Sequence, residues 1–169
     1  MKIIFLDIDG VLNSSRSFAA YQHLDEADED PDLDYFYKTT MKYLDEVAVG
    51  LINRLINETG AKIVLSSTHR KRLHSLVEID TYLKALGLRG ELVGSTPCDP
   101  RGHRGSEIKA WLDQHPVKKY VIIDDDSDML PEQLEFFIHA SGENGMSFKN
   151  FLDALRVLRE ETSSSSPAS

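Results

Sequence analysis

Cysteine is almost absent from this chain of 169 residues, which contains only Cys98. A single cysteine excludes an internal disulfide and a zinc site built from several cysteines. Long hydrophobic runs are also absent, so no segment reaches the ~20 apolar residues of a membrane span. Asp7 and Asp9 interrupt the first apolar run too early for a signal peptide. We therefore expect a cytoplasmic protein that has no membrane partner.

Positive charge is scarce as well, because 19 lysine and arginine residues stand against 28 aspartate and glutamate residues, giving a net charge of −9. An extended nucleic-acid-binding surface needs clustered basic side chains, so we expect none here. Contact with one terminal phosphate stays open. Seven acidic residues fall within residues 25–34. Such a run is typical of a solvated loop, and a lid beside the active site is the alternative.

Strand-like and helix-like patterns alternate along the chain, which predicts an α/β fold with a parallel sheet between helices. The length suits one domain, residues 1–160. Gly60 is expected to end one helix and Ser147 to cap the last. Strands are predicted at residues 3–6, 61–65, 91–93, 120–123 and 136–139, and helices at residues 46–59, 69–86, 106–115 and 147–159.

Two segments fall outside this alternation. Residues 13–43 are polar and irregular, and they are too few for a large cap domain, so we expect only a small acidic cap or flap insertion. The serine-rich tail, residues 161–169, has too little apolar surface to bury and is expected to be disordered.

The most informative residues are Asp7 and Asp9, which follow the apolar run of residues 3–6 where Gly10 breaks it. Ligands of open α/β sheets bind at this carboxyl end of the strands. Residues two apart in an extended segment point the same way. Two carboxylates so placed need a cation, a shared proton or water. A hard cation such as Mg²⁺, which commonly works with substrate phosphate, would suit them.

The segment FLDIDGV, residues 5–11, resembles the first motif of haloacid-dehalogenase-like (HAD) phosphohydrolases. The resemblance implies a three-layer α/β/α Rossmann-like fold with a central, mostly parallel sheet. It also implies that Asp7 attacks phosphorus and that Asp9 acts as general acid and base. Calcium-binding loops also contain a DxDG sequence, but they have a glutamate at the position that Arg16 occupies in this chain.

Hydroxyl groups follow the second strand in VLSSTHR, residues 64–70. Ser66 matches the second HAD motif, whose hydroxyl hydrogen-bonds the transferring phosphoryl group, and Ser67 is the second choice. Plain helix capping is the alternative interpretation of both serines. Arg70 is suited to forked phosphate binding, or it is an exposed residue of the following helix.

Three consecutive aspartates after the fourth strand, Asp124, Asp125 and Asp126, would repel one another without a cation. They resemble the fourth HAD motif, which completes the Mg²⁺ site. The resemblance makes Asp125 the direct ligand and Asp124 an orienting or water-mediated ligand, beside Asp7 and the backbone carbonyl of Asp9. Asp128 is a reserve candidate.

The HAD family also needs a basic residue beside the nucleophile, and two residues before the fourth strand qualify. Arg104 precedes a predicted helix and is preferred. Lys109 lies inside that helix, where a solvated charge is the usual outcome. The histidines lack ligand spacing for a rival metal site, and Cys98 lacks an evident base partner.

Four segments together are similar to the small HAD domain of "Swiss Army Knife" RNA-repair proteins, namely residues 5–13, 65–70, 104–112 and 121–129. This resemblance implies a Mg²⁺-dependent phosphatase acting on nucleotides, nucleic-acid ends or small phosphoesters, and a repair-module partner protein. Two alternatives stay open. One is a catalytically silent Mg²⁺-binding regulatory domain, and the other is a phosphotransferase, which would use the same residues with an alcohol as acceptor.

Overall fold

The structure is a computed structural model that describes residues 1–22, 43–71 and 75–159. Five strands form one sheet in the order β3-β2-β1-β4-β5, and all four pairings are parallel. The predicted α/β architecture is therefore confirmed. The strands are β1 (Lys2–Leu6), β2 (Lys62–Leu65), β3 (Leu92–Ser95), β4 (Lys119–Asp124) and β5 (Phe137–His139).

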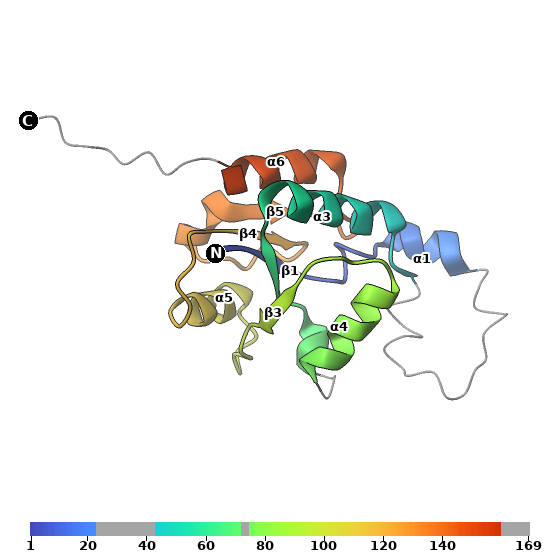
Figure 1. The fold of residues 1–169 in the computed structure, drawn as a ribbon. Helices are drawn as coiled ribbons and strands as arrows, with labels where there is room; N and C mark the ends of the chain where they lie inside the picture. Colours follow the sequence, from blue (N-terminus) through green and yellow to red (C-terminus); the bar gives the residue numbers. More distant parts are fainter. Residues whose placement is uncertain (23–42, 72–74, 160–169) are drawn as a thin grey trace, which may run out of the picture.

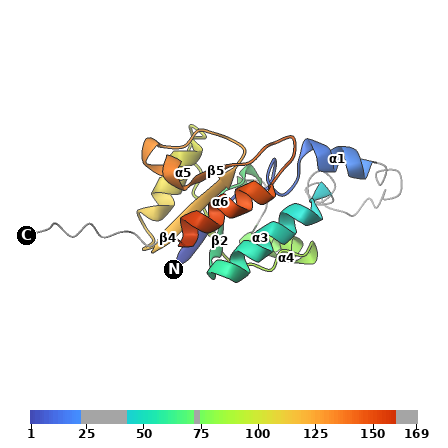
Figure 2. The same ribbon diagram turned by 90° about the horizontal axis from the view of Figure 1, so that it is seen from above.

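Helices cover both faces of the sheet, giving three layers (Figure 1, Figure 2). The helices α3 (Glu46–Thr59) and α6 (Phe148–Arg159) lie side by side on one face, where α4 (Leu76–Ala85) also contributes to the larger core. On the other face α5 (Arg104–Leu112) packs Ile108 and Trp111 against Phe5 of β1. The three central strands β1, β2 and β4 are largely buried, which explains their continuous apolar sequences, whereas the edge strands β3 and β5 are more exposed.

Local signals set the limits of several helices as predicted. Gly60 ends α3 in the left-handed region, with φ of 66°, a conformation that is nearly free of strain only for glycine. Asp45 caps the start of α3, since its side chain accepts a hydrogen bond from the amide of Val47. The Ser147 hydroxyl accepts from the Asn150 amide at 3.2 Å and so caps α6.

Two predicted helices differ from the structure. The helix expected at residues 69–86 is replaced by a 3₁₀ helix, η3 (Thr68–Lys71), and the separate helix α4. Ser75 starts α4 afresh because its backbone is extended and its side chain accepts from the amide of Glu78. Helix α5 begins at Arg104, two residues before the predicted start at residue 106.

The insertion between β1 and α3 contains a helix that the sequence did not indicate. Helix α1 (Ser15–Tyr21) begins with a capping box formed by Ser14 and Ser17. The acidic run at residues 25–34 and the tail at residues 161–169 lie outside the described residues. Among the helices that the structure describes, none has the length and apolar character to cross a membrane.

Candidate active site

The alternation of side chains along β1 determines the direction of Asp7. Phe5 belongs to the core on the α5 face, so Asp7, two residues further on, projects to that same face. Ser66 and Asp124 likewise stand two residues beyond core residues of this face on β2 and β4. The backbone ladder reaches this row, because the amides of Asp7 and Ser66 still donate to the neighbouring strands, at 3.1 and 2.9 Å. The three side chains therefore form a polar row at the carboxyl edge of the sheet.

Arg104, the first residue of α5, joins this row from the side. Its Nη2 donates to Asp7 Oδ2 at 3.0 Å, and its Nε lies 2.8 Å from Asp124 Oδ2. None of the three side chains is more than 7% exposed. Burial alone would lower the pKa of Arg104, but the carboxylates of Asp7, Asp124 and Glu107 outweigh it and raise this pKa. A permanent positive charge thus lies between two of the acids.

Lys109, the other basic candidate, does not reach the row. Its side chain is 51% exposed and forms an ion pair with Asp113 one turn along α5. In a helix that starts at Arg104, position 109 faces solvent, which agrees with the solvated charge expected for Lys109.

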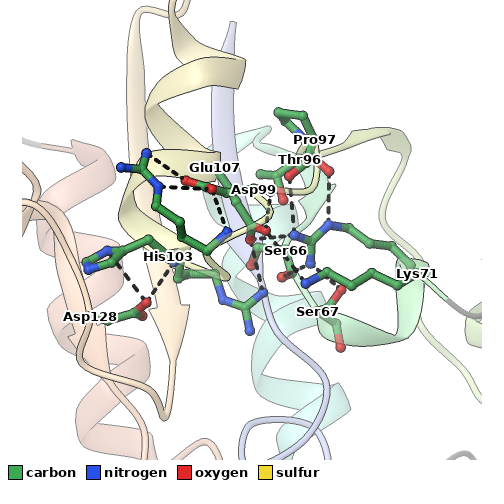
Figure 3. A network of polar contacts seen from close by, with 12 residues as sticks. Ser66, Ser67, Lys71, Thr96, Pro97, Asp99, His103, Glu107 and Asp128 are labelled. Atoms are coloured by element: carbon green, nitrogen blue, oxygen red, sulfur yellow. Dashed lines mark hydrogen bonds and ion pairs between the residues drawn. The ribbon is translucent and has the colours of Figure 1, made fainter.

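The early start of α5 is what brings Arg104 into contact with the acids. Asp128 accepts the Arg104 amide on its side chain at 2.8 Å and the Gly105 amide on its carbonyl at 3.1 Å. A Cβ at Gly105 would lie 2.6 Å from the Leu130 nitrogen, so only glycine permits this close approach. Asp128 therefore holds the start of α5 (Figure 3), and among the described residues the carboxylates that lie close enough to share a cation do not include it.

Three carboxylates meet at one point of the site. One oxygen from each of Asp7, Asp124 and Asp125 lies within 4.8 Å of the others. Asp125 is held against the backbone of Gly10, where a Cβ would come within 2.1 Å of Asp125 Oδ2. Carboxylate oxygens are the ligands that Mg²⁺ prefers, so these residues fit the metal. The Asp9 side chain is not part of this group, and the resemblance assigns only its carbonyl to the metal.

Burial and the neighbouring carboxylates perturb the protonation of Asp124 and Asp125. Burial, and then the charge of Asp7, raise the pKa of Asp124 to about 8, and burial also raises the pKa of Asp125. Without a cation, the folded protein then holds a proton that an unfolded chain releases near pH 4. The contribution of Asp124 to the stability of the folded protein is greatest below about pH 4, and it is lost as the pH rises toward about 8. A divalent cation would compensate the ionised form.

Asp9 lies in a different environment from Asp7. Its side chain is 50% exposed, and its Oδ2 lies 2.6 Å from Nε2 of His69, whose side chain is 8% exposed. Its Oδ1 accepts from Asn13 Nδ2 at 2.8 Å, and the Asn13 oxygen in turn accepts from the Gly10 amide. Sequence reasoning missed both partners. The only signal was their position, since His69 follows Ser66 by three residues and Asn13 follows Gly10 by three.

The hydroxyl of Ser66 is fully buried and has no hydrogen-bond partner among the described residues. The Thr96 hydroxyl, just past β3, shares this state. Ser67 differs, because its hydroxyl accepts a long bond of 3.4 Å from the His69 amide. An unpaired buried hydroxyl costs free energy. A hydrogen bond to a ligand oxygen would therefore stabilise Ser66 more than Ser67, whose hydroxyl already has a partner.

Arg70 was predicted to bind substrate, but its guanidinium is occupied within the protein. Its Nε and Nη groups donate to the carbonyls of Ser66, Ser67, Thr96 and Pro97, and its Nη2 also pairs with Glu107. The side chain is only 3% exposed. In this structure no donor of Arg70 is left for phosphate, because the side chain ties the end of β2 to the segment after β3.

Glu107 of α5 connects this clamp to the rest of the site. Its carboxylate, 2% exposed, pairs with Arg70 and lies 3.9 Å from both Lys71 and Arg104. It also accepts the Asp99 amide at 2.9 Å. Arg104, which pairs with Asp7, is thus also part of a buried network of charges around Glu107.

A parallel sheet that gathers aspartates from two strand ends, a buried hydroxyl and a buried cation at one edge defines a HAD-like domain. The chain belongs to the family described as the HAD domain in Swiss Army Knife RNA repair proteins, whose model matches residues 3–151. Domains of this fold are usually phosphohydrolases and generally use Mg²⁺. No curated protein and no solved structure matches the chain.

Proposed function

We propose that this protein is a Mg²⁺-dependent phosphomonoester hydrolase that acts through an aspartyl-phosphate on Asp7. The observation that carries the proposal is the contrast between the two acids of the first motif. Asp7 is buried against Arg104, beside the unpaired hydroxyl of Ser66. Asp9 is half exposed and lies between two polar side chains. One carboxylate is suited to attack and the other to proton transfer.

In the first half-reaction an oxygen of Asp7 attacks phosphorus while the bond to the leaving oxygen breaks. Asp9, in its protonated form, gives its proton to that oxygen as it departs. Arg104 compensates negative charge beside Asp7, and the Ser66 hydroxyl donates to a phosphoryl oxygen. In the second half-reaction the Asp9 carboxylate removes a proton from water. The water oxygen then attacks phosphorus and the carboxylate of Asp7 is released.

Mg²⁺ would be held by Asp7, Asp125 and the backbone carbonyl of Asp9, with Asp124 orienting the group or binding through water. When bound, it supplies positive charge opposite the phosphoryl oxygens. The clustering of three carboxylates and the raised pKa of Asp124 support this role, because both conditions are relieved by a cation.

The substrate class that we propose is a phosphorylated nucleotide, nucleic-acid end or small phosphoester. The insertion of residues 13–43 is too short for a large cap domain, which favours an accessible site. The family description supports nucleic-acid ends and a repair-module partner protein. The net charge of −9 argues against an extended nucleic-acid surface.

Phosphate release with and without Mg²⁺ tests the proposal. The panel comprises 3′- and 5′-phosphorylated RNA and DNA oligonucleotides, nucleoside monophosphates, sugar phosphates and p-nitrophenyl phosphate, and the isosteric Asp7→Asn protein is the blank. We expect Mg²⁺-dependent release that this variant abolishes, and a radiolabelled phosphoenzyme that accumulates when Asp9→Asn slows its hydrolysis.

The two alternatives give different results in the same experiment. A catalytically silent domain would bind Mg²⁺ but release no phosphate from any member of the panel. A phosphotransferase would release little phosphate in water and would form a new phosphoester when an alcohol acceptor is added. Asp9 argues against the silent domain, because Mg²⁺ binding alone does not need its carboxylate.

A further inference from the structure

His69 is a buried side chain that contacts Asp9 directly and that the proposed mechanism does not use. It lies on η3, three residues after Ser66, and its Nε2 is 2.6 Å from Asp9 Oδ2. The ring is almost fully buried whereas the Asp9 side chain is half exposed. His69 therefore supports Asp9 from the protein side, while half of the Asp9 side chain stays exposed.

The carboxyl group of Asp9 is held at both oxygens. Asn13 donates to Oδ1 at 2.8 Å, and its amide orientation is fixed because its own oxygen accepts the Gly10 amide at 3.0 Å. His69 holds Oδ2. Two bonds on different oxygens prevent rotation of the carboxyl group about its Cβ–Cγ bond. A general acid must keep within about 2.6–3.2 Å of the atom that it protonates, so this restraint bears directly on catalysis.

We propose that His69 is a positioning residue for Asp9: by donating from Nε2 to Oδ2, it directs the acid's own proton toward the leaving oxygen of a phosphoester. This inference rests on the proposed function. If His69 and Asn13 both donate, neither draws the Asp9 proton into the protein, and that proton remains available to the substrate. The segment that carries Ser66 then also sets the direction of the acid, which links phosphoryl contact to leaving-group protonation.

The consequence is a specific dependence on the leaving group. An alkoxide needs a proton as it departs, whereas p-nitrophenolate is a stable anion and needs little assistance. kcat/KM reports the steps up to the first irreversible one, here cleavage of the substrate ester. Misdirection of Asp9 should therefore lower kcat/KM for an alkyl phosphate and leave that for p-nitrophenyl phosphate nearly unchanged.

The test compares His69→Leu, His69→Gln and His69→Asn on the best alkyl phosphate of the panel and on p-nitrophenyl phosphate. In His69→Leu we expect the ratio of the two kcat/KM values to fall at least about tenfold, within the 10²–10⁴-fold total contribution of general acid catalysis. Glutamine places an amide N–H near the position of Nε2 and should restore most of the ratio. Asparagine, one methylene shorter, should not.

His115→Leu is the matched control, because His115 lies beyond the C-terminal end of α5. Its ring stacks on Trp111, and its Nδ1 forms a hydrogen bond with the backbone carbonyl of Trp111. It should leave the ratio unchanged. Equal losses on both substrates in His69→Leu, or equal rescue by glutamine and asparagine, would overturn the positioning role. If His69→Leu does not fold, the glutamine and asparagine variants decide by themselves. If the unmodified protein shows no turnover that depends on Asp7, the proposed function fails first and this inference fails with it.

Discussion

Replacement of Arg70 by methionine removes the cation that ties together three parts of the site. Methionine keeps an unbranched, mainly apolar side chain but supplies no hydrogen-bond donor. The change leaves four backbone carbonyls without their guanidinium partner. It also leaves Glu107, only 2% exposed, without its closest cation. This variant therefore tests whether the buried network is required for the stability of the site.

The expected cost follows from this burial. Removal of one partner from a buried ion pair costs about 3–5 kcal/mol, since the remaining charge is left uncompensated. An exposed pair one helical turn apart contributes only about 0.3–0.5 kcal/mol, so Lys109→Met, which breaks the exposed pair with Asp113, is the matched control. For a domain of this size we expect Arg70→Met to lower Tm by about 6–20 °C.

Urea unfolding followed by the fluorescence of Trp111, the single tryptophan, measures both variants. Glu107→Gln added to Arg70→Met should restore at least about 1 kcal/mol, because it removes the uncompensated charge. Two results would refute the reasoning: a loss of less than about 1 kcal/mol in Arg70→Met, or strict additivity of the two changes. Either would mean that solvent or Arg104 already compensates Glu107.

Two further predictions concern the acidic group. In Gly10→Ala the new Cβ would clash with Asp125 at a φ of +70°, so we expect titration calorimetry to show at least a tenfold loss of Mg²⁺ affinity. The control Gly60→Ala has a similar φ but open space around the Cβ, so it should cost about 1–2 kcal/mol of stability and keep its Mg²⁺ affinity. Equal Mg²⁺ affinities in the two variants would contradict the argument. In metal-free protein the folded pKa of Asp124, about 8, lies above its unfolded value of 3.8, so Asp124 should lower stability by up to about 1.4 kcal/mol per pH unit between these values. Thermal unfolding across pH should show this slope without Mg²⁺, a smaller one with Mg²⁺ and a smaller one in Asp124→Asn; parallel curves would contradict it.

The ends of the strands could be predicted from sequence because they depend on neighbours in the chain. Apolar runs mark buried strands, and Gly60 marks the end of α3 through its own backbone freedom. Since strands of a parallel sheet have their carboxyl ends at one edge, Asp7, Ser66 and Asp124 could be expected to meet there. The structure does place them in one row.

Sequence reasoning did not anticipate the contacts of side chains whose partners lie far along the chain. Arg70 looked like a phosphate ligand because its type and position allowed it, but Glu107, 37 residues away, and the carbonyls after β3 occupy it. His69 was considered only as one of several histidines without metal-ligand spacing, because its partner Asp9 stands 60 residues away. Helix periodicity also ran through Ser75, where a side-chain cap starts a new helix.

The sequence by itself determined which residues stand at the carboxyl ends of the strands, because alternation along a strand and capping at a helix end act over a few residues. Only the tertiary structure decided which of two basic residues touches Asp7, because Arg104 lies 97 residues away and reaches it through the packing of α5 on the sheet. The same packing decided which charges are buried and must be paired. Burial and long-range pairing depend on the whole fold, and no local pattern encodes them.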